Sequence, residues 1–302
     1  MHENLAMNRE VVLLFLDLSK AFNCVDVDTL LAKLDKHGFR GKFSQWIKSF
    51  LKDRPQYVEI KDDHKGIKST GVSVSMGVPQ GSVLGHLMFS IYTNDLSNFV
   101  KGKAECVMFA DDCVLIISEE SRNKLTEKLE NVILLLNSYF SANNLCMNLK
   151  KTHFMQVRKS YLSTHSWTLH LNHPETKAVT QTKKHKFLGV MVDEFFNWKM
   201  QIDNICTKLQ NLGYVFRKLC KYADSITVKT AYHGYNESRL TYGISAWGCS
   251  SKENIERVFK KQKKILRIMS KVDKTASCRK LFVDMKIMTL PCLIIKNCCL
   301  EV

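Results

Sequence analysis

Three aspartates lie at the ends of apolar runs that have the length of buried strands. Asp17 ends the run VVLLFL at residues 11–16, and Asp111 and Asp112 separate ECVMFA from CVLIIS within residues 105–118. If these strands are neighbours, three carboxylates meet at one sheet edge, where like charges repel unless they share a divalent cation. Two Mg²⁺ ions about 3.5–4 Å apart, or Mn²⁺ in their place, would then serve phosphoryl transfer. The alternative is a plain surface turn, because Asp tolerates left-handed backbone.

The overall charge points to a polyanionic partner. The 302 residues include 45 Lys and Arg against 29 Asp and Glu, a formal net charge of +16. This surplus favours nucleic acid first and an anionic membrane second. No apolar run approaches the ~18 residues of a membrane span. Residues 1–10 have no apolar signal-peptide core, so we expect an intracellular protein without a membrane segment.

Cysteine and histidine do not form a recognisable metal motif in the sequence. The 11 cysteines contain no C-x-x-C pair, and we interpret them as reduced thiols. Three histidines, His165, His170 and His173, lie in one polar stretch with no cysteine pair nearby. We interpret that stretch as a loop or hairpin exposed to solvent.

The order of elements predicts an α+β domain followed by a smaller helical one. Helical spacing over residues 28–52 is interrupted by two glycines, and residues 56–76 suggest a strand pair. A loop at residues 77–82 precedes an apolar helix, and an amphipathic helix follows the strands of residues 105–118. From about residue 198 the pattern is helical almost to residue 271. We place the boundary near residue 195, giving domains 1–195 and 196–302.

Five segments, in order along the chain, resemble the motifs of one enzyme family. LFLDLSKAFNCVD (14–26), GVPQGSVLGHLMFSIYTNDL (77–96) and FADD (109–112) resemble the first, second and catalytic-hairpin motifs of reverse transcriptases from non-LTR retrotransposons. LCMNLKKTHFM (145–155) and FLGVMVD (187–193) are similar to the two motifs that follow. LTYGISAWG and QKKILRI, further on, resemble the thumb of jockey-like elements. FADD alone is weak evidence, but five motifs in register are strong.

The resemblance implies a right-hand polymerase palm with residual fingers elements in residues 1–195 and an all-helical thumb in residues 196–302. The implied activity is RNA-directed DNA polymerase, a nucleotidyltransferase that uses an RNA template, a DNA primer, deoxynucleoside triphosphates and two Mg²⁺ ions. The implied metal ligands are Asp17, the backbone carbonyl of Leu18, Asp111 and Asp112.

Other residues take roles from the same resemblance. Phe22 looks like a steric gate against a ribonucleotide 2′-OH, the alternative being ordinary core packing. Lys151 is similar to a lysine that assists the pyrophosphate leaving group, the alternative being a solvated side chain. A loop under the templating base and nucleotide would use Gly77, Pro79, Gln80 and Gly81, and a primer grip would use Phe187, Leu188 and Gly189.

The C-terminal part concentrates positive charge. Residues 251–280 hold eleven Lys and Arg against three Asp and Glu, which is half of the net charge of the chain. In a thumb, such a face would contact template–primer phosphates, although a merely solvated face is the alternative. The candidates are Lys260, Lys261, Lys263, Lys264 and Arg267. The run KKQKK at 260–264 also resembles a nuclear-import signal.

The match departs from the family in a few places. Asn23 stands where the family usually has Asp, and His86 where it usually has Pro. Only sixteen residues precede Asp17, whereas the family places its fingers upstream of that point, and nothing resembles its endonuclease. We therefore expect the chain to bind template–primer but to extend it poorly. The alternatives are an inactive nucleic-acid-binding remnant, an intron maturase or telomerase-like relative, and a basic α+β scaffold.

Overall fold

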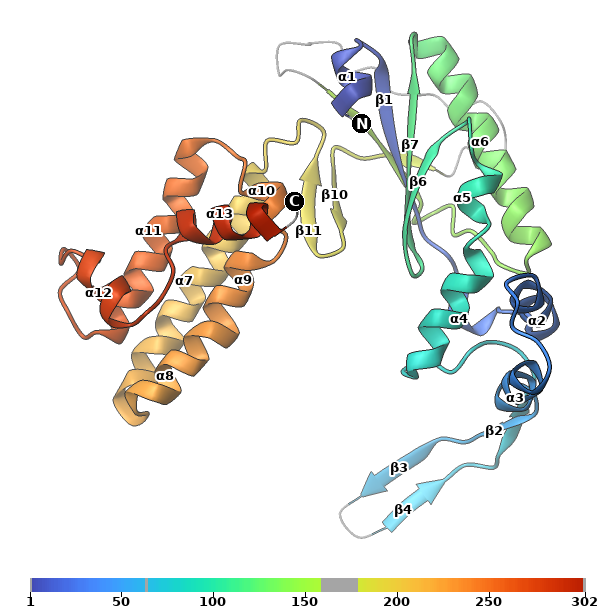
Figure 1. Cartoon of the computed structure of the whole chain (residues 1–302), viewed down its shortest axis with the longest axis horizontal. Coiled ribbons are helices and arrows are strands. Elements are labelled where there is room, and N and C mark those ends of the chain that lie inside the picture. Colours follow the sequence, from blue (N-terminus) through green and yellow to red (C-terminus); the bar gives the residue numbers. More distant parts are fainter. Residues whose placement is uncertain (1, 63–64, 159–178, 301–302) are drawn as a thin grey trace. The chain divides into compact units, whose positions relative to one another are not determined.

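The computed structural model describes residues 2–62, 65–158 and 179–300, and it divides into two compact units (Figure 1). The first unit comprises residues 1–183 and the second comprises residues 184–302. The division lies before residue 195 because a short hairpin joins the helices of the second unit. The boundary between palm and thumb near residue 195 remains a prediction.

A five-stranded sheet forms the centre of the first unit, with the strand order β6-β7-β1-β8-β9. Its strands are β1 (Glu10–Leu16), β6 (Glu105–Phe109), β7 (Asp112–Glu119), β8 (His153–Val157) and β9 (Thr180–Gln181). All neighbours are antiparallel except β8 and β9. Because β1 is paired on both sides and Val11 to Leu16 are buried, its sequence is a continuous apolar run. The predicted α+β class is confirmed.

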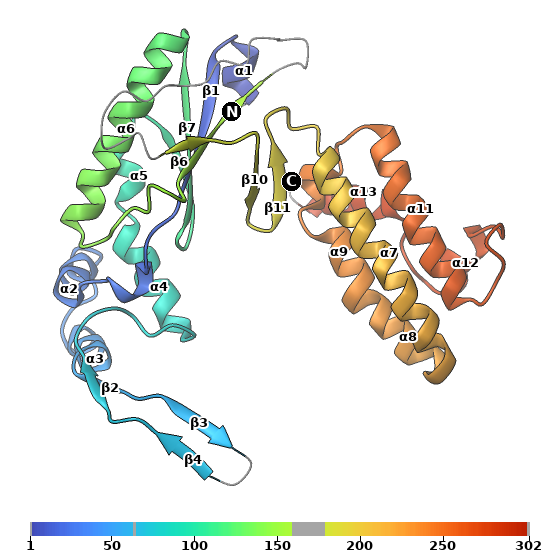
Figure 2. The same ribbon diagram turned by 180° about the vertical axis from the view of Figure 1, so that it is seen from behind.

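Helices complete the core of the first unit. They are α1 (His2–Ala6), α2 (Val27–Lys36), α3 (Lys42–Leu51), α4 (Val83–Thr93), α5 (Leu96–Phe99) and α6 (Arg122–Ala142). Figure 2 shows α6 lying along the sheet, and its buried face includes Leu125, Leu129 and Leu136. Together with Val132 and Ile133, these side chains recur every three to four residues, which explains why the amphipathic pattern predicted a helix here.

Two short antiparallel ribbons connect α3 to α4, as the strand pair expected within residues 56–76 indicated. One pairs β2 (Arg54–Gln56) with β5 (Val72–Val74), and the other pairs β3 (Glu59–Asp62) with β4 (Lys65–Lys68). The helix α4 begins after Ser82, whose Oγ accepts a hydrogen bond from the Gly85 amide at 3.0 Å. That cap ends the loop of residues 77–82.

The second unit contains one hairpin and helices. The hairpin is β10 (Lys184–Phe187) with β11 (Val190–Asp193). The helical elements are α7 (Lys199–Tyr222), α8 (Ser225–Ala231), a π-helix (Tyr232–Glu237), α9 (Ser238–Thr241), α10 (Ile244–Trp247), α11 (Lys252–Met269), α12 (Arg279–Asp284) and α13 (Leu290–Leu300). The unit has its own core, centred on Phe216, Tyr232 and Trp247.

Helix extends past residue 271, where the predicted helical pattern stopped. Inside the core the side chain of Gln262 forms hydrogen bonds with the Tyr232 hydroxyl, the Met288 carbonyl and the Leu290 amide, so its amide group is satisfied.

Among the described residues, we find no helix with the length and apolar character that crossing a bilayer requires.

Candidate active site

The pairing of β1 with β7 brings Asp17 to the turn that follows β6. Leu16 is the register partner of Cys113, so the residue after β1 comes opposite the residue with which β7 begins. That residue is Asp112, and Phe109 is its partner across the hairpin. The prediction that these strands are neighbours is therefore confirmed, although the two segments are almost a hundred residues apart in sequence.

The turn itself differs by one residue from the sequence prediction. Ala110 and Asp111 form it, with Ala110 at a φ of 53°, and Asp112 is the first residue of β7. The prediction had placed both aspartates in the turn. It was wrong by one residue because the ladder continues to the pair Phe109–Asp112, which leaves only Ala110 and Asp111 for the turn.

The three carboxylates act on one another electrostatically. Partial burial raises the pKa of Asp112, and the negative charges of Asp111 and Asp17 raise it further. Carboxylate oxygens are ligands that Mg²⁺ and Mn²⁺ favour, so this donor set fits a hard divalent cation. Within the described ranges, however, no three His, Cys, Asp or Glu side chains lie close enough together to hold a metal ion.

The segment that contains Lys151 also lies against Asp17. The Nζ of Lys151 is 3.9 Å from the Asp17 Oδ2, with the two side chains 71% and 41% exposed, so this is a weak, solvated ion pair. The Asn148 amide donates to the Asp17 carbonyl at 2.8 Å, and the Ser19 amide donates to the Cys146 carbonyl at 2.9 Å. These two bonds hold the backbone of Leu18 from both sides.

Phe22 and the loop of residues 77–82 are joined through their backbones. The Val78 amide donates to the Phe22 carbonyl at 2.8 Å, and the Gly77 amide donates to the Val25 carbonyl at 2.8 Å. Gly77 has a φ of +77°, and a Cβ there would lie 2.8 Å from the Asn23 Cα. The chain therefore requires glycine at residue 77.

The ring of Phe22 is mostly buried, with 9% of the residue exposed. Its centroid lies 4.7 Å from that of Phe89 and 5.2 Å from that of His86. Both interpretations of Phe22 thus keep support, since a core ring can present one edge. His86, an apparent departure from the family pattern, packs edge-on against this ring. Pro79 is half-buried, whereas Gln80 and Gly81 are exposed.

Sequence reasoning missed Arg54, which links α3 to the same loop. Its guanidinium donates to the carbonyls of Leu51 at 3.0 Å, Met76 at 3.1 Å and Gly77 at 2.9 Å. A single arginine after a helix carries no pattern in one sequence, because its partners are backbone groups of a segment more than twenty residues away. Arg54 therefore positions the loop in which four nucleotide-binding residues were predicted.

Comparison with known proteins agrees with this geometry. Residues 2–192 match the family described as reverse transcriptase (RNA-dependent DNA polymerase). The chain belongs to this family. Reverse transcriptases generally use divalent metal ions and act on nucleic acids.

Its relatives are polymerases of mobile elements. The chain is 26% identical over 267 residues to a probable RNA-directed DNA polymerase from transposon BS of Drosophila melanogaster, covering 85% of this chain and 28% of that protein. It is 25% identical over 266 residues to the RNA-directed DNA polymerase of the mobile element jockey from the same organism, again 85% and 28%. The resemblance to non-LTR elements is confirmed, and the chain spans less than a third of the length of these relatives.

Among solved structures, apo telomerase from Candida tropicalis is similar to this chain. The match has a TM-score of 0.47 and 11% identity, and it covers 94% of this chain and 45% of that one. A second telomerase, from Candida albicans in complex with a telomeric RNA fragment, gives a TM-score of 0.36 and 13% identity over 91% and 47%.

In the second unit, Phe187, Leu188 and Gly189 lie at the β10–β11 turn. Phe187 pairs with Val190, and Leu188 and Gly189 have φ values of 45° and 81°, as in the tight hairpin turns that suit twisted strands. The hydroxyl of Tyr242 donates to the Leu188 carbonyl. Their role in gripping a primer remains a prediction.

The five predicted phosphate contacts lie on α11 in different environments. Lys261 donates to the Gln210 Oε1 at 3.0 Å, and the Lys263 Nζ lies 4.1 Å from the centre of the Phe259 ring. Arg267 donates through Nε to the Ala276 carbonyl at 2.8 Å. Lys260 and Lys264 are exposed one helical turn apart. This pair is the best placed to meet a phosphate backbone.

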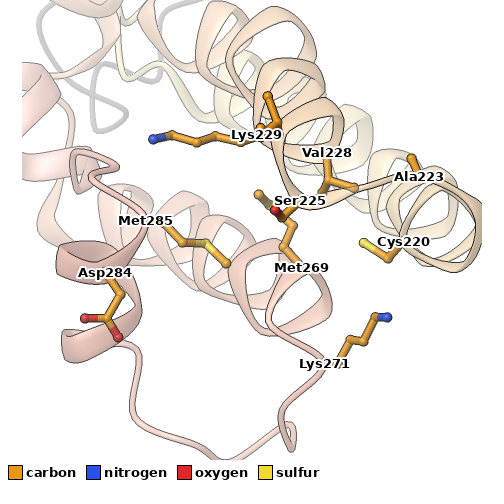
Figure 3. A pocket seen from close by; sticks show the side chains of 10 residues that line it. Cys220, Ala223, Ser225, Val228, Lys229, Met269, Lys271, Asp284 and Met285 are labelled. Atoms are coloured by element: carbon orange, nitrogen blue, oxygen red, sulfur yellow. The ribbon is translucent and has the colours of Figure 1, made fainter.

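One further feature of the second unit lies away from the predicted site residues. The second unit has an open pocket of about 340 Å³ between the end of α7, α8, the end of α11 and α12, and Figure 3 shows Lys229 and Lys271 projecting from different sides around Met269 and Met285. None of the predicted site residues lines it. The histidine stretch with His165, His170 and His173 lies outside the described residues.

Proposed function

We propose that this chain is the palm and thumb of a non-LTR retroelement reverse transcriptase, adding deoxynucleotides to the 3′-OH of a DNA primer on an RNA template. The observation that carries the proposal is the meeting of Asp17 with Asp111 and Asp112 at one end of β1 and β7 in a chain of this family. The pKa of Asp112 is raised first by partial burial and then by the negative charges of Asp111 and Asp17.

In this proposal the metal ligands are Asp17, the Leu18 carbonyl, Asp111 and Asp112. Two bound Mg²⁺ ions, or Mn²⁺, would activate the primer oxygen and stabilise the leaving oxygen. Among the described residues, the carboxylates lie near enough to repel one another, but they do not form a cluster that could hold a metal ion by itself. The ends of β1 and β7 keep these side chains in the same region. The exposed ammonium of Lys151, 3.9 Å from the Asp17 carboxylate, would assist the departing pyrophosphate.

The surrounding residues would orient the substrates. Backbone hydrogen bonds join the Phe22 segment to the loop that contains Gly77, Pro79, Gln80 and Gly81. A nucleotide whose base contacts the loop and whose sugar contacts the Phe22 ring would therefore be oriented by both. The edge of Phe22 would exclude a 2′-OH. The turn of residues 187–189 would hold the primer end, and the α11 lysines would contact backbone phosphates.

A calorimetric titration with Mn²⁺ tests the metal site. Asp17→Ala and Asp111→Ala should each abolish the tighter binding event without unfolding the chain. Glu105→Gln is the matched control, because this exposed carboxylate lies on the same hairpin away from the turn and should bind metal as wild type does. Identical affinity in all four proteins would refute the assignment.

Primer extension on an RNA template tests the activity. Incorporation of deoxynucleotides that Asp111→Ala abolishes and Glu105→Gln preserves would support catalysis by this centre. If the chain binds template–primer but incorporates no deoxynucleotide under saturating metal, the alternative function, nucleic-acid binding without catalytic turnover, is supported instead.

We also infer nuclear import through residues 260–264. The run lies within α11, with Lys260 and Lys264 exposed. A fluorescent fusion should leave the nucleus when both lysines are changed to Gln, and an unchanged distribution would argue against the signal.

A further inference from the structure

Four aromatic rings form a row that begins before α3 and follows one side of that helix. The members of this aromatic row are Phe39, Phe43, Trp46 and Phe50, and successive ring centres lie 5.3, 5.9 and 6.1 Å apart. Phe39, Phe43 and Trp46 are 41%, 42% and 52% exposed. Single exposed apolar side chains are ordinary, but a continuous row of rings indicates a binding surface.

The row is attached to the loop that the proposed function places under the templating base. Immediately after α3, Arg54 donates hydrogen bonds to the Leu51 carbonyl of that helix and to the Met76 and Gly77 carbonyls of the loop. One guanidinium thus links the end of the helix to the start of the loop. Whatever rests on the aromatic row lies on the same support as the predicted base-binding loop.

The charge around the row selects a polyanion. Residues 35–54 contain six Lys and Arg against two acidic residues; Arg40 pairs with Asp35 at 3.0 Å, and Lys52 pairs with Asp28 at 2.7 Å. Lys42 is four residues before Trp46 and therefore on the same side of α3, whereas Lys48 is two residues after it and on the opposite side. Aromatic rings bordered by cations are the arrangement by which proteins bind unpaired nucleic acid, through base stacking and phosphate contacts.

We propose that the aromatic row binds the unpaired template strand ahead of the site of synthesis. The inference rests on the proposed function, because it takes the attached loop to lie beneath the templating base. Bases that have not yet been copied would stack on Phe43 and Trp46, and Lys42 would contact the backbone beside them. Stacking is tolerant of sequence, as a polymerase that copies any template requires.

Fluorescence anisotropy with two labelled template–primers tests the proposal on the full chain. One duplex is blunt, and the other carries a ten-nucleotide single-stranded 5′ extension of the template. Wild type should bind the extended duplex more tightly than the blunt one. The double variant Phe43→Leu, Trp46→Leu keeps apolar volume but removes the rings, and it should reduce this gain by about fivefold or more for each stacked base.

Matched controls isolate stacking and charge. Phe99→Leu changes a ring of similar exposure (43%) on α5 and should keep the gain, as should Trp46→Phe, which retains a stacking face. Lys42→Gln should weaken binding of the extended duplex more than Lys48→Gln, although each removes one charge from the same helix.

Three results would overturn the proposal. The first is that the wild type binds the extended duplex no more tightly than the blunt one, and the second is that the Leu double variant keeps the wild-type gain in affinity. The third is that the double variant differs from the wild type only in forming a smaller oligomer, which would make the row an interface between copies of the chain. Failure of wild type to bind even the blunt duplex would instead count against the proposed function. Binding of single-stranded RNA alone would then decide whether the row acts by itself.

Discussion

Replacing Gly77 with alanine should destabilise the first unit by a margin that the structure allows one to work out. Gly77 has a φ of +77°, and a Cβ there would meet backbone on every side, at 2.8 Å from the Asn23 Cα and carbonyl oxygen and 2.9 Å from the Phe22 oxygen. Backbone atoms cannot rotate away as a flexible side chain can. The loop must therefore move.

The magnitude follows from the separate contributions. Left-handed backbone at a residue with Cβ costs about 1–2 kcal/mol. The smaller entropy of the unfolded alanine chain offsets about 0.4–1 kcal/mol of this cost. Moving the loop strains two hydrogen bonds, from the Gly77 amide to the Val25 carbonyl and from the Val78 amide to the Phe22 carbonyl, both 2.8 Å long. At about 1 kcal/mol each, the total loss is about 3 kcal/mol.

Gly81 supplies the control within the same loop. Its φ is +82°, almost the same, but a Cβ there would meet nothing within 4 Å. Gly81→Ala should therefore cost only the conformational contribution, about 1 kcal/mol or less. Urea denaturation of the two variants, followed by far-UV circular dichroism, measures the difference of about 2 kcal/mol. Equal destabilisation by Gly77→Ala and Gly81→Ala would refute the argument from close backbone approach.

Three further predictions concern charge and thiols. Asp112→Asn should stabilise the metal-free chain increasingly as pH rises above 3.8, the ordinary pKa of the carboxyl group, because the raised pKa of Asp112 means that its ionisation costs folding free energy. Urea titrations in EDTA at pH 3 and pH 7 measure this effect. An equal change in unfolding free energy at both pH values would contradict the prediction. Changing Lys260 and Lys264 to Gln should lower the slope of log affinity for template–primer against log salt by about 0.7–0.9 for each phosphate that the helix no longer neutralises, and an unchanged slope would mark a solvated face. Iodoacetamide, followed by peptide mass spectrometry, should modify exposed Cys146 well before Cys220, whose pKa is raised by burial; similar rates would contradict the burial of Cys220.

Several elements could be predicted from the sequence because their causes are local. Six consecutive apolar residues before Asp17 indicated a strand buried on both faces, and β1 is that strand. The apolar spacing after residue 122 indicated α6, because side chains three and four residues apart share one face of a helix. The clustering of lysine on α11 and the order of the family motifs also needed no coordinates.

The meeting of the carboxylates needed the tertiary structure. Periodicity shows which face of a strand is buried, but not which strand lies beside it, since many pairings bury the same apolar side chains. The order β6-β7-β1-β8-β9 puts strands from distant parts of the chain side by side. Only that order brings Asp17 opposite the hairpin and Lys151 within 3.9 Å of its carboxylate.

Sequence alone therefore determined which residue types and charges this chain carries, and which short segments become strands and helices, because these depend on neighbours within a few residues. Tertiary structure decided the one-residue shift of the hairpin turn and the bonds from Arg54 to the loop. The first depends on strand register and the second on where a side chain finds a distant backbone carbonyl, and packing sets both.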